Sequence, residues 1–217
     1  MCKVTAFLDN ENFILTSNRD IPENRVHSLP PSEFLYNSEK IVYPEDPKGK
    51  GSWIGTSKRY IASILNNMGI ESSDKISRGI LLKDIISNSF AISDLERKTN
   101  LFNPYILILF DKLKNELFKY TWDGSALICE QIYENYLWMS NTIYSKEEII
   151  NTSNFFKKEL DKKSNSKEIL SFHLNPKNII KNKVRTTSVT QIRYGLNNEI
   201  KYFDLINDKK YNYKLSI

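Results

Sequence analysis

The residues with the clearest chemical potential in this sequence are Cys2, at the start of the chain, and the pair Arg19-Asp20. Removal of Met1 would leave Cys2 with a thiol of pKa about 8.5 and an α-amine of pKa about 7.7–8.0. The amine can act as general base for the thiol, so that one residue supplies both nucleophile and base. Arg19 and Asp20 would shift the thiol pKa in opposite directions, with the balance set by distance. This pattern predicts an N-terminal cysteine nucleophile.

A β-hairpin is expected to bring these residues together. Residues 3–8 and 13–17 read as strands, and Asp9-Asn10-Glu11-Asn12 between them predicts a turn. Antiparallel partners of similar length end where the other begins, so residues 18–20 should lie beside residue 2. Asn18 fits a turn former as well as a residue of the site.

The rest of the sequence predicts further strands and two or three helices. Residues 22–50 contain five of the seven prolines and are expected to be rich in loops. Helical periodicity covers residues 77–90, with Ser77 as N-cap, and residues 147–160. The inward face of the second helix is expected to contain Ile149, Ile150, Phe156 and Leu160. Strands or short apolar runs are expected at residues 60–65, 105–110, 116–122, 125–131, 136–140, 185–192 and 200–206.

Length and composition narrow the class of protein. The 217 residues, 40% of them hydrophobic, indicate a single folded domain over residues 1–217. No apolar run reaches the roughly 18 residues of a membrane span. The N-terminus does not have the pattern of a secretory signal, and two cysteines are too few for a disulfide scaffold. A cytoplasmic protein without a membrane span is therefore expected.

Charge and metal-ligating residues suggest neither nucleic-acid binding nor a metal site. The net charge of +5 comes from 31 basic and 26 acidic residues that are mixed along the chain, not clustered as in a nucleic-acid-binding surface. Cys2, Cys129, His27 and His173 do not have the spacing of a zinc site, and neither histidine receives a role. Cys129 lies in a strand-like run and is expected to be a small buried residue. No metal or cofactor is expected.

Several sequence blocks occur in an order that is familiar from one family. They are Met1-Cys2-Lys3-Val4, Thr16-Ser17-Asn18-Arg19-Asp20, Pro30-Pro31, Asp46-Pro47, Gly51-Ser52-Trp53-Ile54-Gly55, Asn66, Ser77-Arg78-Gly79, Trp138-Met139-Ser140-Asn141-Thr142 and Val184-Arg185-Thr186-Thr187-Ser188-Val189. Together they make the chain resemble the NRDE family, also called the transport and Golgi organisation protein family, over nearly its whole length. One position departs, because Ile21 stands where that family has Glu.

The resemblance implies a relative of the N-terminal-nucleophile hydrolases. Their fold is of the α+β class, a four-layer αββα sandwich of two antiparallel sheets with helices outside. The implied reaction is hydrolysis of a non-peptide amide bond in a small acyl substrate. Two asparagines would act as oxyanion donors, which can be worth about 2.7–4 kcal/mol each. The implied catalytic residues are Cys2, Arg19, Asp20, Asn66, Asn141 and Arg185.

Two other functions stay open from the sequence. One is a carrier or chaperone that holds haem or another hydrophobic ligand in the same cleft, as the family's association with haem handling suggests. The other is a scaffold without a small-molecule site. Simpler interpretations also exist for single residues: a buried ion pair for Arg19 and Asp20, a turn for Asn141, a surface position for Arg185 and a structural role for Trp53. The substrate and the oligomeric state are not indicated.

Overall fold

The computed structural model describes residues 2–8, 12–160, 164–175, 180–181 and 184–216. The chain divides into two compact units. The first comprises Met1–Arg25 and Glu134–Ser216, and the second comprises Val26–Tyr133. Each unit is built around its own antiparallel sheet.

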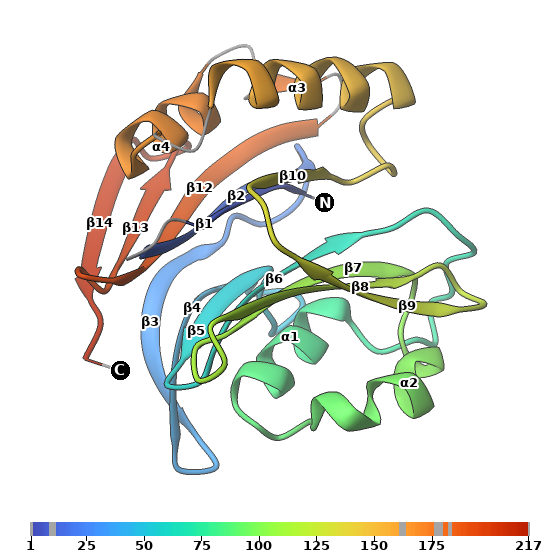
Figure 1. Cartoon of the computed structure of the whole chain (residues 1–217). Helices are drawn as coiled ribbons and strands as arrows, with labels where there is room; N and C mark the ends of the chain where they lie inside the picture. Colours follow the sequence, from blue (N-terminus) through green and yellow to red (C-terminus); the bar gives the residue numbers. More distant parts are fainter. Residues whose placement is uncertain (1, 9–11, 161–163, 176–179, 182–183, 217) are drawn as a thin grey trace. The chain divides into compact units, whose positions relative to one another are not determined.

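The sheet of the first unit has the strand order β10-β1-β2-β12-β13-β14, and β11 pairs with β12 outside this path. Helices α3 (Lys146–Glu159) and α4 (Ser166–Leu174) lie along one face of this sheet (Figure 1). The strands are β1 (Cys2–Leu8), β2 (Asn12–Pro22), β10 (Tyr136–Met139), β11 (Ile180–Lys181), β12 (Val184–Gly195), β13 (Glu199–Asp204) and β14 (Lys209–Lys214).

Apolar side chains join the two helices to this sheet. Phe7 of β1 and Ile14 of β2 belong to one buried cluster with Phe156 of α3 and Phe172 of α4. Since side chains alternate between the faces of a strand, the odd residues of β1 and the even residues of β2 face the helices. We call this side of the first sheet the helix face. Both helices begin with a capping box, which satisfies backbone N–H groups of their first turns.

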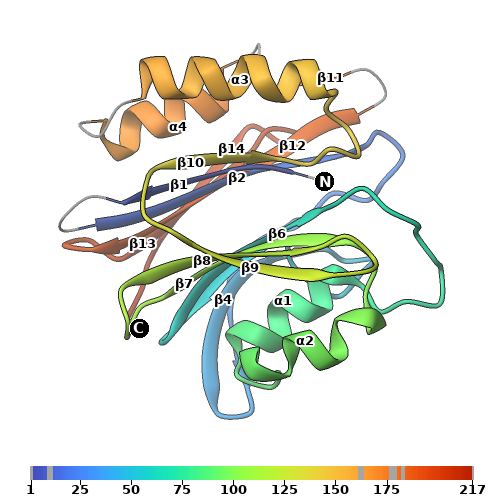
Figure 2. The same ribbon diagram turned by 45° about the vertical axis from the view of Figure 1, so that its right-hand side comes forward.

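The sheet of the second unit has the order β3-β4-β5-β6-β7-β8-β9, in which each strand pairs with the next along the chain. Helix α1 (Arg78–Ile86) packs on β5 and β6 through four fully buried side chains, Leu81, Leu82, Ile85 and Ile86. Figure 2 shows α1 and α2 (Leu95–Lys98) on one side of this sheet. The strands are β3 (Leu29–Tyr36), β4 (Glu39–Glu45), β5 (Ile54–Ser57), β6 (Tyr60–Asn66), β7 (Tyr105–Asp111), β8 (Glu116–Trp122) and β9 (Leu127–Ile132), and two short 3₁₀ helices are Ile92–Asp94 and Thr99–Leu101.

The predicted α+β class, with two antiparallel sheets and helices, is confirmed. The predicted hairpin exists as β1 and β2, although Asp9, Asn10 and Glu11 of its predicted turn lie outside the described residues. The helices predicted at residues 77–90 and 147–160 are present as α1 and α3, and Ser77 is the N-cap of α1 without a side-chain capping bond. None of the described helices has the length and hydropathy that crossing a membrane would require.

The prediction of a loop-rich segment over residues 22–50 was wrong, because β3 and β4 form a hairpin there. Pro30 and Pro31 lie in β3, one of the two edge strands of the sheet, where a missing N–H need not cost a ladder bond. The pairing of β3 is also irregular between Leu29 and Ser32. Asn37 and Ser38 both have positive φ angles, 48° and 65°, as a tight two-residue hairpin turn requires.

Two smaller predictions also need correction. Ile150 does not face inward but is 48% exposed. Cys129 lies in β9 as predicted, yet its side chain is exposed and not buried, since β9 is an edge strand. The sequence analysis also missed α4 and β14.

The sequence blocks around Gly51 and Gly79 meet in the second unit. A Cβ atom on Gly51 would lie 2.3 Å from the backbone carbon of Gly79, and Ser52 N–H donates to Gly79 C=O at 3.1 Å. Gly51 is therefore needed for the close approach of two backbones. Trp53, which follows, is buried, and its C=O accepts hydrogen bonds from Ile64 N–H and Ser63 Oγ.

We expect Gly51→Ala to lower the free energy of unfolding by about 1–3 kcal/mol, because two backbone segments must move apart. Urea unfolding of the variant measures this loss. Gly49→Ala is the matched control, because the nearest atom to its new Cβ is a side-chain oxygen of Asp46 at 3.2 Å. Equal losses in the two variants would contradict the close-approach explanation.

Candidate functional site

The hairpin places Cys2 in direct register with Arg19. In the first sheet Cys2 of β1 pairs with Arg19 of β2, and Arg19 pairs on its other side with Ser188 of β12. Arg19 is buried, with 6% of its surface exposed. The structure therefore brings two of the predicted site residues into one row across three strands.

A β-bulge in β12 shapes this row. Thr186 pairs with Asp20 and Ser188 pairs with Arg19, so Thr187 is the extra residue between them. Its hydroxyl donates to the Arg19 C=O at 3.3 Å. Bulges of this kind re-aim side chains and are common beside active sites. Here the bulge sets Thr186 against Asp20 and Ser188 against Arg19.

Arg19 and Asp20 lie on opposite faces of the sheet. Asp20 faces the helices, where it accepts a hydrogen bond from Tyr144 Oη at 2.7 Å. Consecutive strand residues alternate, so Arg19 projects from the other face. This alternation does not fit the alternative reading of the two residues as a buried ion pair with each other.

The face that Arg19 shares also carries two buried hydroxyl groups. Ser188 is opposite Arg19, and Thr190 is opposite Ser17, the next residue of β2 on the same face. Both residues are fully buried, and within the described part of the chain neither Ser188 Oγ nor Thr190 Oγ1 has a hydrogen-bond partner. Buried hydroxyls are normally paired, so these two donors are available to a bound molecule or water.

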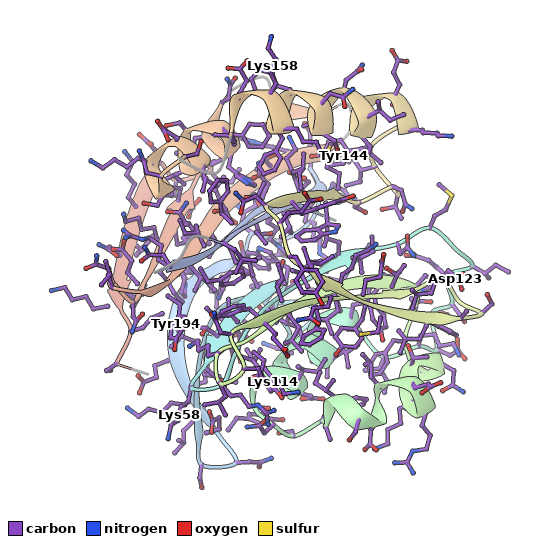
Figure 3. The ribbon with its side chains drawn as sticks, in the orientation of Figure 1. Lys58, Lys114, Asp123, Tyr144, Lys158 and Tyr194 are labelled. Atoms are coloured by element: carbon purple, nitrogen blue, oxygen red, sulfur yellow. The ribbon has the colours of Figure 1, made fainter. Side chains whose placement is uncertain are left out.

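Asp20 is the centre of a buried polar cluster on the helix face. Its carboxylate accepts hydrogen bonds from Tyr144 Oη at 2.7 Å and from Thr186 Oγ1 at 2.5 Å. Tyr144 lies between α3 and the sheet, as Figure 3 shows, and Lys3 Nζ lies 5.5 Å from the centre of its ring. Burial raises the pKa of Asp20, whereas the two hydroxyls and the Lys3 ammonium lower it, and the net direction is upward.

His173 of α4, which was assigned no role in the sequence analysis, is fully buried against the helix face. Its Nε2 lies 2.8 Å from Thr5 Oγ1, and its Nδ1 contacts Asn18 Oδ1. Asn18 also donates to the His173 C=O at 3.3 Å, so Asn18 is a strand residue that holds α4 and not a turn former. Burial, with the nearby Lys3 charge, lowers the pKa of His173 well below 6.5. The ring is therefore neutral and its role is structural.

We expect the protein to lose stability below about pH 6.5, because the unfolded chain can protonate His173 and the folded chain cannot. The free energy of unfolding should fall by up to about 1.4 kcal/mol per pH unit in this range. Urea unfolding between about pH 5 and pH 7.5 measures this slope. His173→Gln should remove it, whereas His27→Gln, at an exposed position, should keep it. A slope unchanged in His173→Gln would contradict this origin.

Two more predicted site residues belong to the first unit. Asn141 lies in the turn between β10 and α3, two residues after Met139, which pairs with Lys3. It is therefore at the same end of the sheet as Cys2. Arg185 of β12 is exposed and pairs with Ile21, next to Asp20. The turn that contains Asn141 also contains Tyr144, whose N–H donates to the Ser140 C=O at 3.1 Å.

Asn66 is the last residue of β6, in the second unit, at the predicted strand end. It pairs with Tyr105 of β7. Its neighbour Asn67 is buried and donates to the Trp122 C=O at 3.1 Å. A role for Asn66 in a site on the first unit stays a prediction.

Sequence reasoning missed Tyr144, Thr186 and Ser188 as neighbours of the predicted pair. The usable signal was the run of small hydroxyl residues around the bulge, whose polarity is unusual in a central strand. Lys3 gave a second signal, because it stands at an inward position of an alternating strand. Among the residues that the structure describes, no three His, Cys, Asp or Glu side chains gather as a metal site.

Comparison with known proteins agrees with the sequence blocks. The family model described as Transport and Golgi organisation 2 matches residues 1–213 of the chain. A search of curated proteins found no match.

Proposed function

Since the chain belongs to the Transport and Golgi organisation 2 family, we propose that it hydrolyses a non-peptide amide bond of a small acyl substrate, with Cys2 as nucleophile. The proposal requires that Met1 is removed, so that the α-amine of Cys2 is free to act as base. The proposal combines two arguments, which are the reactivity of a terminal cysteine and the position of Cys2 in the first sheet.

The observation that carries the proposal is the register of Cys2 with the buried Arg19. Directly paired residues of antiparallel strands project to the same face. A guanidinium close to a thiol stabilises the thiolate and lowers the thiol pKa. This supports a nucleophile that is ionised near neutral pH.

The proposed reaction has two steps. The Cys2 thiolate attacks the carbonyl carbon, and the C–N bond breaks as the leaving amine takes a proton from the α-ammonium group. The product of this step is a thioester with Cys2. Water, deprotonated by the α-amine, then attacks the thioester, and the C–S bond breaks to release the carboxylic acid and restore the Cys2 thiolate and the α-ammonium group.

Other residues of the first unit support these steps. The hydroxyls of Ser188 and Thr190, which have no hydrogen-bond partner among the described residues, lie on the face of Arg19 and can donate to a substrate oxygen. We propose that Asp20, on the helix face, fixes the end of β2 through its hydrogen bonds and supplies a negative charge on the opposite face of the sheet from Arg19. We propose the turn residue Asn141 as oxyanion donor and the exposed Arg185 as an additional positive charge near the site.

A panel of N-acyl amides tests the proposal by release of the free amine. The untagged chain should hydrolyse at least one of them, whereas a chain with an N-terminal extension should fold and remain inactive because it has no free α-amine at Cys2. Equal turnover by both chains would contradict the role of the amine. Reversible haem binding without turnover of any amide would favour a carrier function instead.

A further inference from the structure

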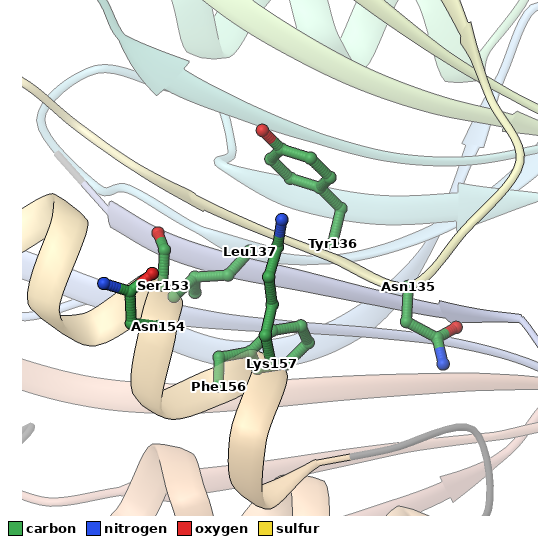
Figure 4. Close-up of a pocket in the computed structure, with 7 residues that line it drawn as sticks. All are labelled: Asn135, Tyr136, Leu137, Ser153, Asn154, Phe156 and Lys157. Carbon is green, nitrogen blue, oxygen red and sulfur yellow. The ribbon is translucent and has the colours of Figure 1, made fainter.

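A hollow in the first unit lies beside α3 at the free edge of β10, and its volume is about 80 Å³. Leu137 of β10 and Phe156 of α3 line it with apolar surface, and both are buried. Figure 4 shows Ser153 and Lys157 of α3 on its rim, with the Lys157 ammonium extended toward Tyr136. The hollow thus combines an apolar floor with a positive charge.

The polar side chains that α3 contributes to the rim differ from that of Asn135, whose Oδ1 accepts a hydrogen bond from Leu8 N–H at 2.8 Å. Ser153 and Lys157 are four positions apart on α3, so their side chains are neighbours on the helix surface. For the described residues, the structure gives no hydrogen bond or ion pair to the side chains of Ser153, Asn154 or Lys157. Because β10 is an edge strand, alternate backbone groups along it are also open to a ligand.

We propose that this hollow binds a small organic carboxylate with a short apolar chain. The Lys157 ammonium and the Ser153 hydroxyl would bind the carboxylate, and the chain would lie on Leu137 and Phe156. A water molecule needs about 10–15 Å³ of a cavity volume measured in this way, so the hollow has room for roughly five to eight non-hydrogen atoms. The apolar floor favours an organic anion over a fully hydrated inorganic one.

The proposed carboxylate site is separate from the row of Cys2. Tyr136 at the hollow pairs with Ala6, which is four residues from Cys2 along β1. At about 3.3 Å per residue this separation is about 13 Å. The carboxylate site can therefore be correct whether or not Cys2 is a nucleophile.

Titration of the ¹⁵N-labelled protein with sodium butyrate, followed by backbone amide shifts, tests this site. We expect saturable shifts at Leu137 and Phe156 that 1-butanol does not produce at the same concentration. Lys157→Gln should weaken butyrate binding by about two- to fivefold, as the loss of one exposed positive charge implies. Lys158→Gln is the matched control, because Lys158 points away from the sheet (Figure 3) and should bind as the wild type does.

Three outcomes would overturn the carboxylate site. The first is equal shifts with butyrate and 1-butanol, which would show that the carboxylate charge does not contribute to binding. The second is an unchanged affinity in Lys157→Gln. The third is tighter binding of inorganic phosphate than of butyrate, which would contradict the role of the apolar floor.

Discussion

Cys2→Ala is expected to lower amide hydrolysis by about 10³-fold or more, because removal of a nucleophile leaves only binding and oxyanion contacts. The fold should be kept, because alanine fits a strand position and the pairing of residue 2 with Arg19 depends on the backbone. Steady-state rates with the most reactive amide of a substrate panel measure the effect. Circular dichroism and urea unfolding show whether the variant is folded.

The second cysteine of the chain gives the matched control. Cys129 is exposed on β9 in the second unit, so Cys129→Ala removes a thiol without touching the Cys2 row. We expect wild-type rates from this variant. If hydrolysis survives in Cys2→Ala and is lost in Cys129→Ala, the nucleophile is Cys129, and the proposal for Cys2 is contradicted.

Asp20→Ala is expected to lower the free energy of unfolding by about 2–4 kcal/mol. The change leaves the buried hydroxyls of Tyr144 and Thr186 without their acceptor, and each unpaired buried group costs about 1–3 kcal/mol. It also removes the negative charge beside the buried Lys3. Relief from burying a carboxylate, which raises the pKa of Asp20, offsets part of the loss. Urea unfolding at neutral pH measures the difference.

A smaller change in the same cluster separates hydrogen bonding from packing. Tyr144→Phe removes only the hydroxyl that donates to Asp20, and we expect a loss of about 1.5–3 kcal/mol. Tyr133→Phe is its matched control, because Tyr133 is 80% exposed and donates to Gln131 at the surface. If the two variants lose the same stability, the Asp20 cluster does not contribute as described.

Sequence reasoning was most successful where local pattern decides the structure. The two strand-like runs and the short turn between them predicted a hairpin that brings residues 18–20 beside residue 2, and the pairing of Cys2 with Arg19 confirms it. The apolar stripe of α1 was equally visible. In both cases the residues that come together belong to one helix or to two consecutive strands.

It was less successful where tertiary context decides. Pro30 and Pro31 suggested a loop, but an edge strand tolerates prolines. His173 could not be connected with Thr5 and Asn18 because more than 150 residues separate it from either. The opposite orientation of Arg19 and Asp20 follows from a strand that continues to Pro22, beyond the end that the sequence predicted.

Intact-mass analysis of the untagged protein, before and after reaction with an acylating probe, tests the N-terminal nucleophile most directly. We predict a chain that lacks Met1 and gains a single acyl group, which peptide mapping locates on Cys2. Retention of Met1, or an acyl group on Cys129 or a lysine with none on Cys2, would contradict the proposal that a free terminal cysteine opposite Arg19 carries the chemistry.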